Sequence, residues 1–197
     1  FGQDHLGIIG NIGDFFALNN VGLYANAMHG ATIPFLMFFA YQLMFCVITA
    51  PLMTGAFAGR INVKGYIWLL IVWTILIYIP VCHWVWGNGF LAKMGFVDFA
   101  GGTVIHTSAG FGALACAIFF GKRVLKKGEK TDPNNLVLVA IGVALLWFGW
   151  FGFNSGGALA ANELAATAFV NTAVALAVAM VAWMIIVKIR NGRVSFS

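Results

Sequence analysis

The chain has 197 residues, of which 61% are hydrophobic and only 9% are charged, and its mean hydropathy is +0.92. Soluble domains carry about 25% charged residues, so this composition excludes a soluble globular protein and indicates an integral membrane protein. The formal net charge is +5. This excess does not point to nucleic acid as a partner, because the basic residues lie in short segments between or after long apolar runs.

Five apolar runs follow a mixed N-terminal segment. Residues 1–30 combine glycine, asparagine, aspartate and histidine, and they predict a surface loop with one short helical turn. Each later run has about the 20 apolar residues that a membrane-spanning helix needs. The predicted spans are 31–58, 65–86, 99–120, 134–156 and 163–187. The expected fold is therefore all-α, a polytopic transmembrane helix bundle in a lipid bilayer.

Three of the spans begin with recognisable start signals. Asp132-Pro133 places a side-chain cap and then a proline at the start of the fourth span. Asn162-Glu163 starts the fifth span with a cap and a negative charge in the first turn. Asp98 precedes the third span and is expected to cap it with its charge at the positive helix end. The chain begins with Phe1 and stops soon after a span, so we expect a piece of a longer protein.

The basic residues predict the orientation of the chain. Ten of the eleven fall on one side of the predicted spans: Arg60, Lys64, Lys122, Arg123, Lys126, Lys127, Lys130, Lys188, Arg190 and Arg193. By the positive-inside rule that side is cytoplasmic, so the chain should start outside and end inside, with Lys93 outside. The Lys122–Lys130 cluster is either a solvated loop that obeys this rule or a site for anionic lipid or a protein partner.

The third span carries a histidine near its middle. At 100° per residue, small residues share the face of His106: Gly102, Thr103, Ala109, Gly110, Ala113 and Ala117. Val104, Phe111 and Ile118 lie on the other side. Small residues allow close helix packing, so His106 should point into the bundle. An ionisable residue at that depth indicates a functional site, although a neutral histidine that ties two helices together is the alternative.

Aromatic residues gather in three of the spans. They are Tyr41 and Phe45 in the first span, Trp84 and Trp86 in the second, and Trp147, Trp150, Phe151 and Phe153 in the fourth. Each group alone is typical of packing or of interfacial anchoring. Together with one deep histidine and no charge pair, they favour a path for a small solute that enters as a cation and travels at least partly as a neutral molecule.

No enzyme chemistry or metal site is indicated by the remaining residues. Cys46, Cys82 and Cys116 lie inside apolar runs without metal-binding spacing, so we interpret them as small apolar core residues. We therefore expect neither a cofactor nor a metal ion.

Several motifs together resemble one known family. They are Trp86-Gly-Asn-Gly, Asp98-Phe-Ala-Gly-Gly-Thr-Val-Ile-His106, Gly121-Lys122-Arg123, Gly149-Trp150-Phe151-Gly152-Phe153-Asn154 and Ala161-Asn162-Glu163. These strings, with the loop lengths between them, resemble the ammonium transporter family (Amt/Mep/Rh) over nearly the whole chain. The resemblance implies eleven spans in two inverted repeats and a homotrimer with one pore in each subunit. The chain would then be a partial transporter domain, residues 1–197, that corresponds to spans three to seven.

The resemblance also implies roles for particular residues. Trp86, Tyr41 and Asp98 would belong to the outer vestibule that recruits ammonium, with Asp98 also holding the vestibule helices in place. Phe45 and Phe153 would stack as a gate, and His106 and Trp150 would line the pore. The second pore histidine would lie outside this chain. A signalling protein of the PII type docks on the cytoplasmic face of many relatives, where Lys122–Lys130 would lie.

One position departs from the family pattern. Gly157 stands where a serine usually completes the outer site of the family, so we expect this chain to hold the ion more loosely than relatives with that serine. Ser155 could replace the missing hydroxyl only if the helix ends before Gly157, because two residues on a helix point about 200° apart. Two rival functions remain: an ammonium sensor of the same fold coupled to a signalling module, and a gas channel of the Rh kind without an ion site.

Overall fold

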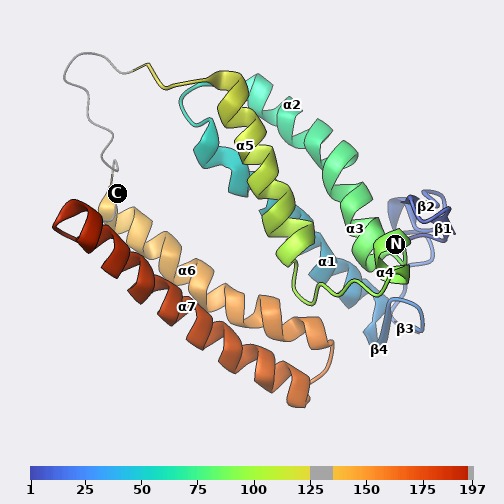
Figure 1. Cartoon of the computed structure of the whole chain (residues 1–197). Helices are drawn as coiled ribbons and strands as arrows, with labels where there is room; N and C mark the ends of the chain where they lie inside the picture. Colours follow the sequence, from blue (N-terminus) through green and yellow to red (C-terminus); the bar gives the residue numbers. More distant parts are fainter. Residues whose placement is uncertain (125–134, 195–197) are drawn as a thin grey trace. The chain divides into compact units, whose positions relative to one another are not determined.

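The computed structural model describes residues 1–124 and 135–194, and it divides into two units, Phe1–Val124 and Leu125–Ser197 (Figure 1). Five helices among the described residues are long and apolar enough to cross a membrane: Phe35–Ala56, Val63–Lys93, Gly102–Phe120, Leu136–Ala158 and Glu163–Asn191. Each predicted span overlaps one of them, so the prediction of an all-α polytopic membrane fold is confirmed. Asp132-Pro133 and the basic residues Lys126, Lys127 and Lys130 lie outside the described residues.

The first two spans are built from several helical pieces. The first joins α1 (Phe35–Thr49) to the 3₁₀ segment η2 (Ala50–Ala56). The second runs through α2 (Val63–Trp73), the π-helical η3 (Thr74–Tyr78) and α3 (Ile79–Trp86). The short α4 (Phe90–Lys93) follows after a turn. The second span therefore reaches Trp86 before the chain turns, as its predicted range did.

The N-terminal segment contains structure that the sequence did not predict. It forms two antiparallel hairpins, β1 (Asp4–His5) with β2 (Ile9–Gly10) and β3 (Ala25–Asn26) with β4 (Gly30–Pro34). The predicted helical turn is present as η1 (Phe16–Leu18). The predicted start of the first span at residue 31 was wrong, since residues 31–34 are a strand. The residue before a proline avoids the α region, so the helix begins only after Pro34.

The third span begins with a wide helical turn. It consists of the π-helical η4 (Gly102–Thr107) followed by α5 (Ser108–Phe120). The backbone N–H of His106 donates to the carbonyl of Gly101, five residues earlier, at 3.1 Å. Such a turn contains more residues than an α-helical turn and changes which residues share a face. Val104, predicted on the face away from the bundle, is instead 0% exposed, whereas Phe111 and Ile118 are exposed as predicted.

A glycine in the third span allows the first unit to pack closely. A Cβ atom at Gly112 would lie 2.4 Å from Met53 Sδ and 2.8 Å from Trp73 Nε1. Met53 comes from η2 and Trp73 from α2, and both are buried. The three spans of the first unit therefore meet at Gly112, in agreement with the principle that small residues permit close helix approach.

Polar contacts close the two ends of the first unit. At one end, Arg60 donates to the carbonyl oxygens of Ala56 and Gly121, and Arg123 donates to that of Ala58 at 2.9 Å. At the other end, the Lys93 ammonium contacts the Asp4 carboxylate. Within this unit, Arg60 and Arg123 thus lie at one end and Lys93 at the other. The sequence analysis likewise placed Arg60 and Arg123 on one side of the spans and Lys93 on the opposite side.

The second unit is a pair of antiparallel helices, α6 (Leu136–Ser155) and α7 (Glu163–Asn191), coloured orange and red in Figure 1. The Asn162 side chain accepts from the N–H of Ala165, which confirms the predicted start of the fifth span. α7 continues past the predicted end at 187, because Lys188 and Arg190 suit the negative end of a helix. It stops at Gly192, whose φ of 73° suits glycine.

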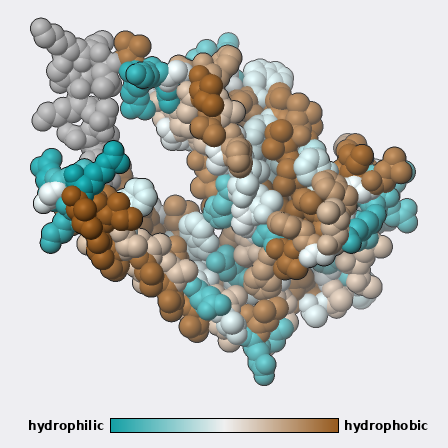
Figure 2. All heavy atoms as spheres, in the orientation of Figure 1, coloured by the Kyte–Doolittle hydropathy of each residue, from teal (hydrophilic) through white to brown (hydrophobic). Residues whose placement is uncertain are grey.

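Apolar side chains cover much of the visible surface of both units (Figure 2). Phe148 on α6 and Ile189 on α7 are each 80% exposed, and Phe119 on α5 is 83% exposed. A surface of this kind is unfavourable in water and suits contact with lipid or with other membrane helices.

Candidate functional site

The first unit brings three aromatic side chains together beside the end of α3. Trp86 and Phe45 meet edge to face, with ring centroids 5.3 Å apart and an interplanar angle of 88°. Phe45 in turn meets Tyr41, one turn earlier on α1, at 4.8 Å and 74°. Phe45 is only 2% exposed, while Trp86 and Tyr41 are half-buried. Three of the predicted site residues, from two spans, therefore form one continuous aromatic cluster.

The orientation of the Trp86 indole is held by a backbone contact. Its Nε1–H donates to the main-chain carbonyl of Asp98 at 2.7 Å. An indole has only this one polar donor, so the hydrogen bond fixes the rotation of the ring in addition to the contact with Phe45. The neighbouring Trp84 has a different hydrogen-bond partner: its Nε1–H donates to the carbonyl of Ile8 in the N-terminal hairpin at 2.9 Å.

The Asp98 carboxylate accepts four backbone hydrogen bonds at the start of the third span. Oδ1 accepts from Gly101 at 2.7 Å and Gly102 at 2.8 Å. Oδ2 accepts from Thr103 at 2.8 Å and Val104 at 3.0 Å. The predicted capping role is confirmed, although the residue at the cap position is Gly101, with φ of 96°. A carboxylate has about four acceptor positions, and these contacts occupy all of them.

His106 lies in the wide turn that Asp98 caps. It is an exposed residue of the described chain, on η4, and its position along the helix is set by the bond from its backbone N–H to Gly101. Asp98 therefore supports two of the predicted site residues at once. Its carbonyl holds Trp86, and its carboxylate holds the turn that carries His106.

The second unit holds the remaining predicted site residues. Trp150 and Phe153 approach at 6.5 Å and 66°, and Phe151 stacks on Phe169 of α7 at 4.4 Å. Asn154 donates to the Thr172 hydroxyl at 2.9 Å. Phe153 and Phe45 belong to different units, so their pairing as a gate stays a prediction.

The helix ends before Gly157, which is the condition under which Ser155 could replace the missing serine hydroxyl. The α-helical part of α6 ends at Ser155, and Gly157 lies in the 3₁₀ turn η5 (Gly156–Ala158). The Ser155 hydroxyl oxygen is buried, and within the described residues it has no hydrogen-bond partner. A buried hydroxyl without a partner is unfavourable, which makes Ser155 a candidate for a contact that the described chain does not supply.

The sequence analysis missed a buried polar cluster at the C-terminal end of the second span. His83 is 3% exposed, and its Nε2 lies 2.8 Å from Asp4 Oδ1. The Lys93 ammonium and His83 hold the pKa of Asp4 well below its ordinary range, at about 2. His83 could have been singled out, as His106 was, because it is ionisable and lies in an apolar run. Its partner is 79 residues away, so no spacing motif connects the two.

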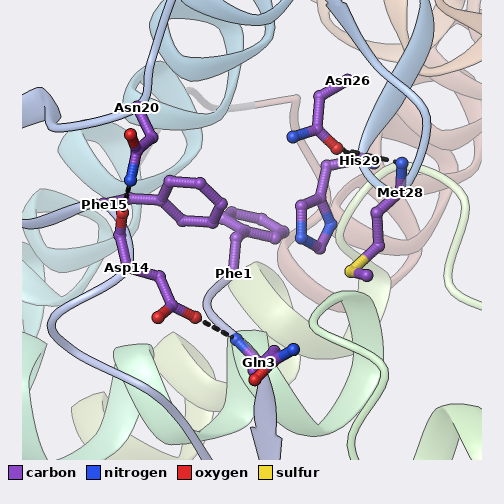
Figure 3. A pocket seen from close by; sticks show the side chains of 8 residues that line it. All are labelled: Phe1, Gln3, Asp14, Phe15, Asn20, Asn26, Met28 and His29. Atoms are coloured by element: carbon purple, nitrogen blue, oxygen red, sulfur yellow. Dashed lines mark hydrogen bonds between the residues drawn. The ribbon is translucent and has the colours of Figure 1, made fainter.

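A separate cavity of about 350 Å³ lies in the N-terminal segment (Figure 3). Its lining residues are Phe1, Gln3, Asp14, Phe15, Asn20, Asn26, Met28 and His29. The ring of His29 stacks on Phe35 and Phe38 of α1, and burial lowers its pKa. Asp14 accepts from the Gln3 N–H at 2.6 Å and from the Asn11 amide at 2.7 Å. The ring contacts of His29 anchor the segment to α1, and the cavity includes none of the predicted site residues.

The structure shows no metal centre among the residues it describes. Within 1–124 and 135–194, no three histidine, cysteine or acidic side chains lie close enough together to hold a metal ion. Cys46, Cys82 and Cys116 are free thiols.

Five apolar helices, with an aromatic cluster and a histidine-bearing wide turn, define the chain as part of a polytopic membrane protein. The chain belongs to the Ammonium Transporter Family, whose sequence profile matches residues 1–197. The resemblance found in the motifs is thereby confirmed.

Relatives from distant organisms support this assignment. The chain is 45% identical to an ammonium transporter of Aquifex aeolicus over 93% of its length and 42% of the relative. It is also 45% identical to ammonium transporter Amt1 of Archaeoglobus fulgidus, over 94% of this chain and 45% of that one. It superimposes on Saccharomyces cerevisiae Mep2 with a TM-score of 0.85 and 34% identity, over 96% of this chain and 43% of that one. The chain thus spans somewhat less than half the length of the relatives it matches.

We predict that the contact between Asp4 and His83 persists at mildly acidic pH. A carboxyl group with a lowered pKa stabilises the folded state above its unfolded pKa, here 3.8, and this contribution is lost as the pH falls toward about 2. The backbone bond from Phe90 N–H to the Gly7 carbonyl reports whether the hairpin is in place. Its hydrogen-exchange protection, corrected for intrinsic rates, should be equal at pH 7.5 and pH 5. Loss of protection between these values would show that a group other than Asp4 controls the contact.

Proposed function

We propose that this chain forms the outer vestibule and part of the conduction path of an ammonium/ammonia transporter. The observation that carries the proposal is the Tyr41–Phe45–Trp86 cluster, whose indole is fixed by the Asp98 carbonyl. Family membership and transporter relatives at 45% identity support it. Residues 1–197 would be a partial transporter domain that contributes five spans.

The proposed mechanism begins with attraction of the ammonium ion by aromatic faces. A desolvated cation over an aromatic ring gains about 2 kcal/mol. Removing all water from an ion in a low-dielectric pore costs far more than this gain. The ion would therefore transfer its proton to water at the vestibule, and the neutral ammonia would pass on. Trp86 and Tyr41 would recruit the ion, while Asp98 would act by holding Trp86 and the helix start, because its carboxylate oxygens are already engaged.

Below the vestibule, Phe45 and Phe153 would form a gate, and His106 and Trp150 would line the pore. Histidine can hold or pass a proton near neutral pH, which suits a path for a molecule that changes protonation state. The position of His106 in a π-helical turn supports this role, because such turns are frequent at functional sites. A second pore histidine would come from outside this chain.

The proposed setting is a cell membrane. The N-terminal hairpins and Lys93 would face outward, and Arg60, Arg123, Lys188 and Arg190 would face the cytoplasm. A homotrimer and a cytoplasmic PII-type partner near Lys122–Lys130 are proposals that rest on the resemblance to the family.

We expect His106→Ala to abolish selective ammonium flux in the complete gene product while the protein still assembles in the membrane. Methylammonium uptake in a strain without its own ammonium transporters measures the flux, and detergent-extracted assembly size reports the fold. Failure to assemble would assign His106 a structural role. Ammonium binding without uptake by the unmodified protein would contradict transport and favour the sensor.

We expect Trp86→Leu to weaken the apparent affinity for methylammonium by up to about 2 kcal/mol, or about 30-fold. The loss of the indole removes the cation–π face while leaving an apolar side chain in place. Trp68→Leu on α2 is the matched control, because Trp68 is 66% exposed and lies outside the cluster. Equal affinities for the two variants would place Trp86 among ordinary interfacial anchors.

We expect Gly157→Ser to tighten ammonium binding by about tenfold, since a hydrogen bond to a charged partner contributes about 1.5–3 kcal/mol. If affinity does not change, the Ser155 hydroxyl already completes the outer site or the outer site is not used. Ser155→Ala separates these cases in the same binding assay. It should weaken binding in the first case and leave it unchanged in the second.

A further inference from the structure

The N-terminal hairpin is fastened to the outer end of the second span at four points. The Asp4 carboxylate contacts His83 and Lys93, the Trp84 indole donates to the Ile8 carbonyl, and Phe90 N–H donates to the Gly7 carbonyl. All four contacts join the β1–β2 hairpin to the segment from His83 to Lys93. This segment includes Trp86 and the turn that follows it.

The His83 ring is enclosed by glycines. A Cβ atom at Gly87 would lie 2.5 Å from His83 Nδ1, and one at Gly10 would lie 3.1 Å from it. The Nδ1 atom is buried and has no hydrogen-bond partner in the described chain. The bond from Nε2 to Asp4 is therefore the polar contact that holds the ring. A buried polar group that loses its partner is strongly disfavoured, so removal of Asp4 would release this ring.

His83 also closes the end of the helix that carries Trp86. Its main-chain carbonyl accepts from the N–H groups of Gly87 and Gly89, each at 3.0 Å. Trp86 is the last residue of α3 and lies three positions after His83, on the same turn. Helix ends fray unless their terminal groups are held. Displacement of His83 would thus loosen the turn on which the Trp86 backbone depends.

We propose that Asp4 and His83 are positioning residues for Trp86: the hairpin, held by the Asp4–His83 contact, keeps the last turn of α3 and its indole in the geometry that recruits the cation. The inference rests on the proposed role of Trp86 in the outer site. Lys93 contributes less to this positioning, because its side chain is 51% exposed and exposed ion pairs are weak. The Asp4 side chain, by contrast, is 13% exposed.

The test compares Asp4→Asn with Asp14→Asn in the complete gene product. Asp14 is the matched control, because it lies in the same N-terminal segment and accepts hydrogen bonds from Gln3 and Asn11 but none from α3. Both variants remove one negative charge from the same segment. Asp4→Asn should raise the KM for methylammonium about five- to tenfold, a change in the range of coupling between residues in one network. The maximal rate should stay within about twofold of the unmodified value, and Asp14→Asn should change neither.

A second pair of variants distinguishes positioning from a general structural role. If Asp4 acts through Trp86, Asp4→Asn should have little further effect on KM when Trp86→Leu is already present. An equal rise in both backgrounds, or a fall in maximal rate without a rise in KM, would overturn the proposal. Absence of uptake by the unmodified protein would instead contradict the proposed transport function, so the two failures are distinguishable.

Trp84→Phe provides an independent test if Asp4→Asn does not reach the membrane. This change keeps an aromatic ring but removes the indole N–H that holds the same hairpin through Ile8. It should raise the KM in the same direction, by about two- to threefold, the size of a single neutral hydrogen bond at the low end of its range. An unchanged KM for a normally inserted Trp84→Phe protein would overturn the proposal.

Discussion

The start of the third span depends on one carboxylate. In a bilayer, water cannot satisfy the free N–H groups at a helix end, so the protein must supply acceptors. Asp98 supplies them to four consecutive residues, Gly101 to Val104. The same residue offers its carbonyl to Trp86. The aromatic cluster and the histidine-bearing turn thus share one support, and their relative position follows from the geometry of a single residue.

Local chemistry explains why much of this arrangement was predictable from the sequence. Hydrophobic runs of span length give five helices because every backbone group in lipid needs an internal partner. The capping roles of Asp98 and Asn162 followed from side-chain acceptors placed just before apolar runs. Tyr41 and Phe45 are four residues apart, a spacing that places two side chains on one helix face, and they meet in the structure.

The features that escaped prediction all depend on distant contacts or on backbone geometry without a sequence signal. The first hairpin turns through Leu6, whose φ of 56° is unusual for a residue with a side chain. The sequence therefore contained no turn motif that predicted this hairpin. Its partner surface includes His83, far along the chain. The π-helical turn that contains Val104 and His106 also made the predicted face of Val104 wrong, because a projection at 100° per residue presumes a regular α-helix.

The wide turn also has a consequence for how this segment tolerates change in length. A π-helical turn is equivalent to an α-helix with one additional residue, and it persists only while its surroundings hold it. Removal of a single residue between Gly102 and Thr107 would let the helix return to regular spacing, while Asp98 remained tied to the helix start. His106, four residues after Gly101 instead of five, would then keep its direction, whereas an added residue would rotate it by about 100° relative to Asp98 and Trp86. The interval from Asp98 to His106 should therefore accept the loss of one residue from the wide turn more readily than the gain of one.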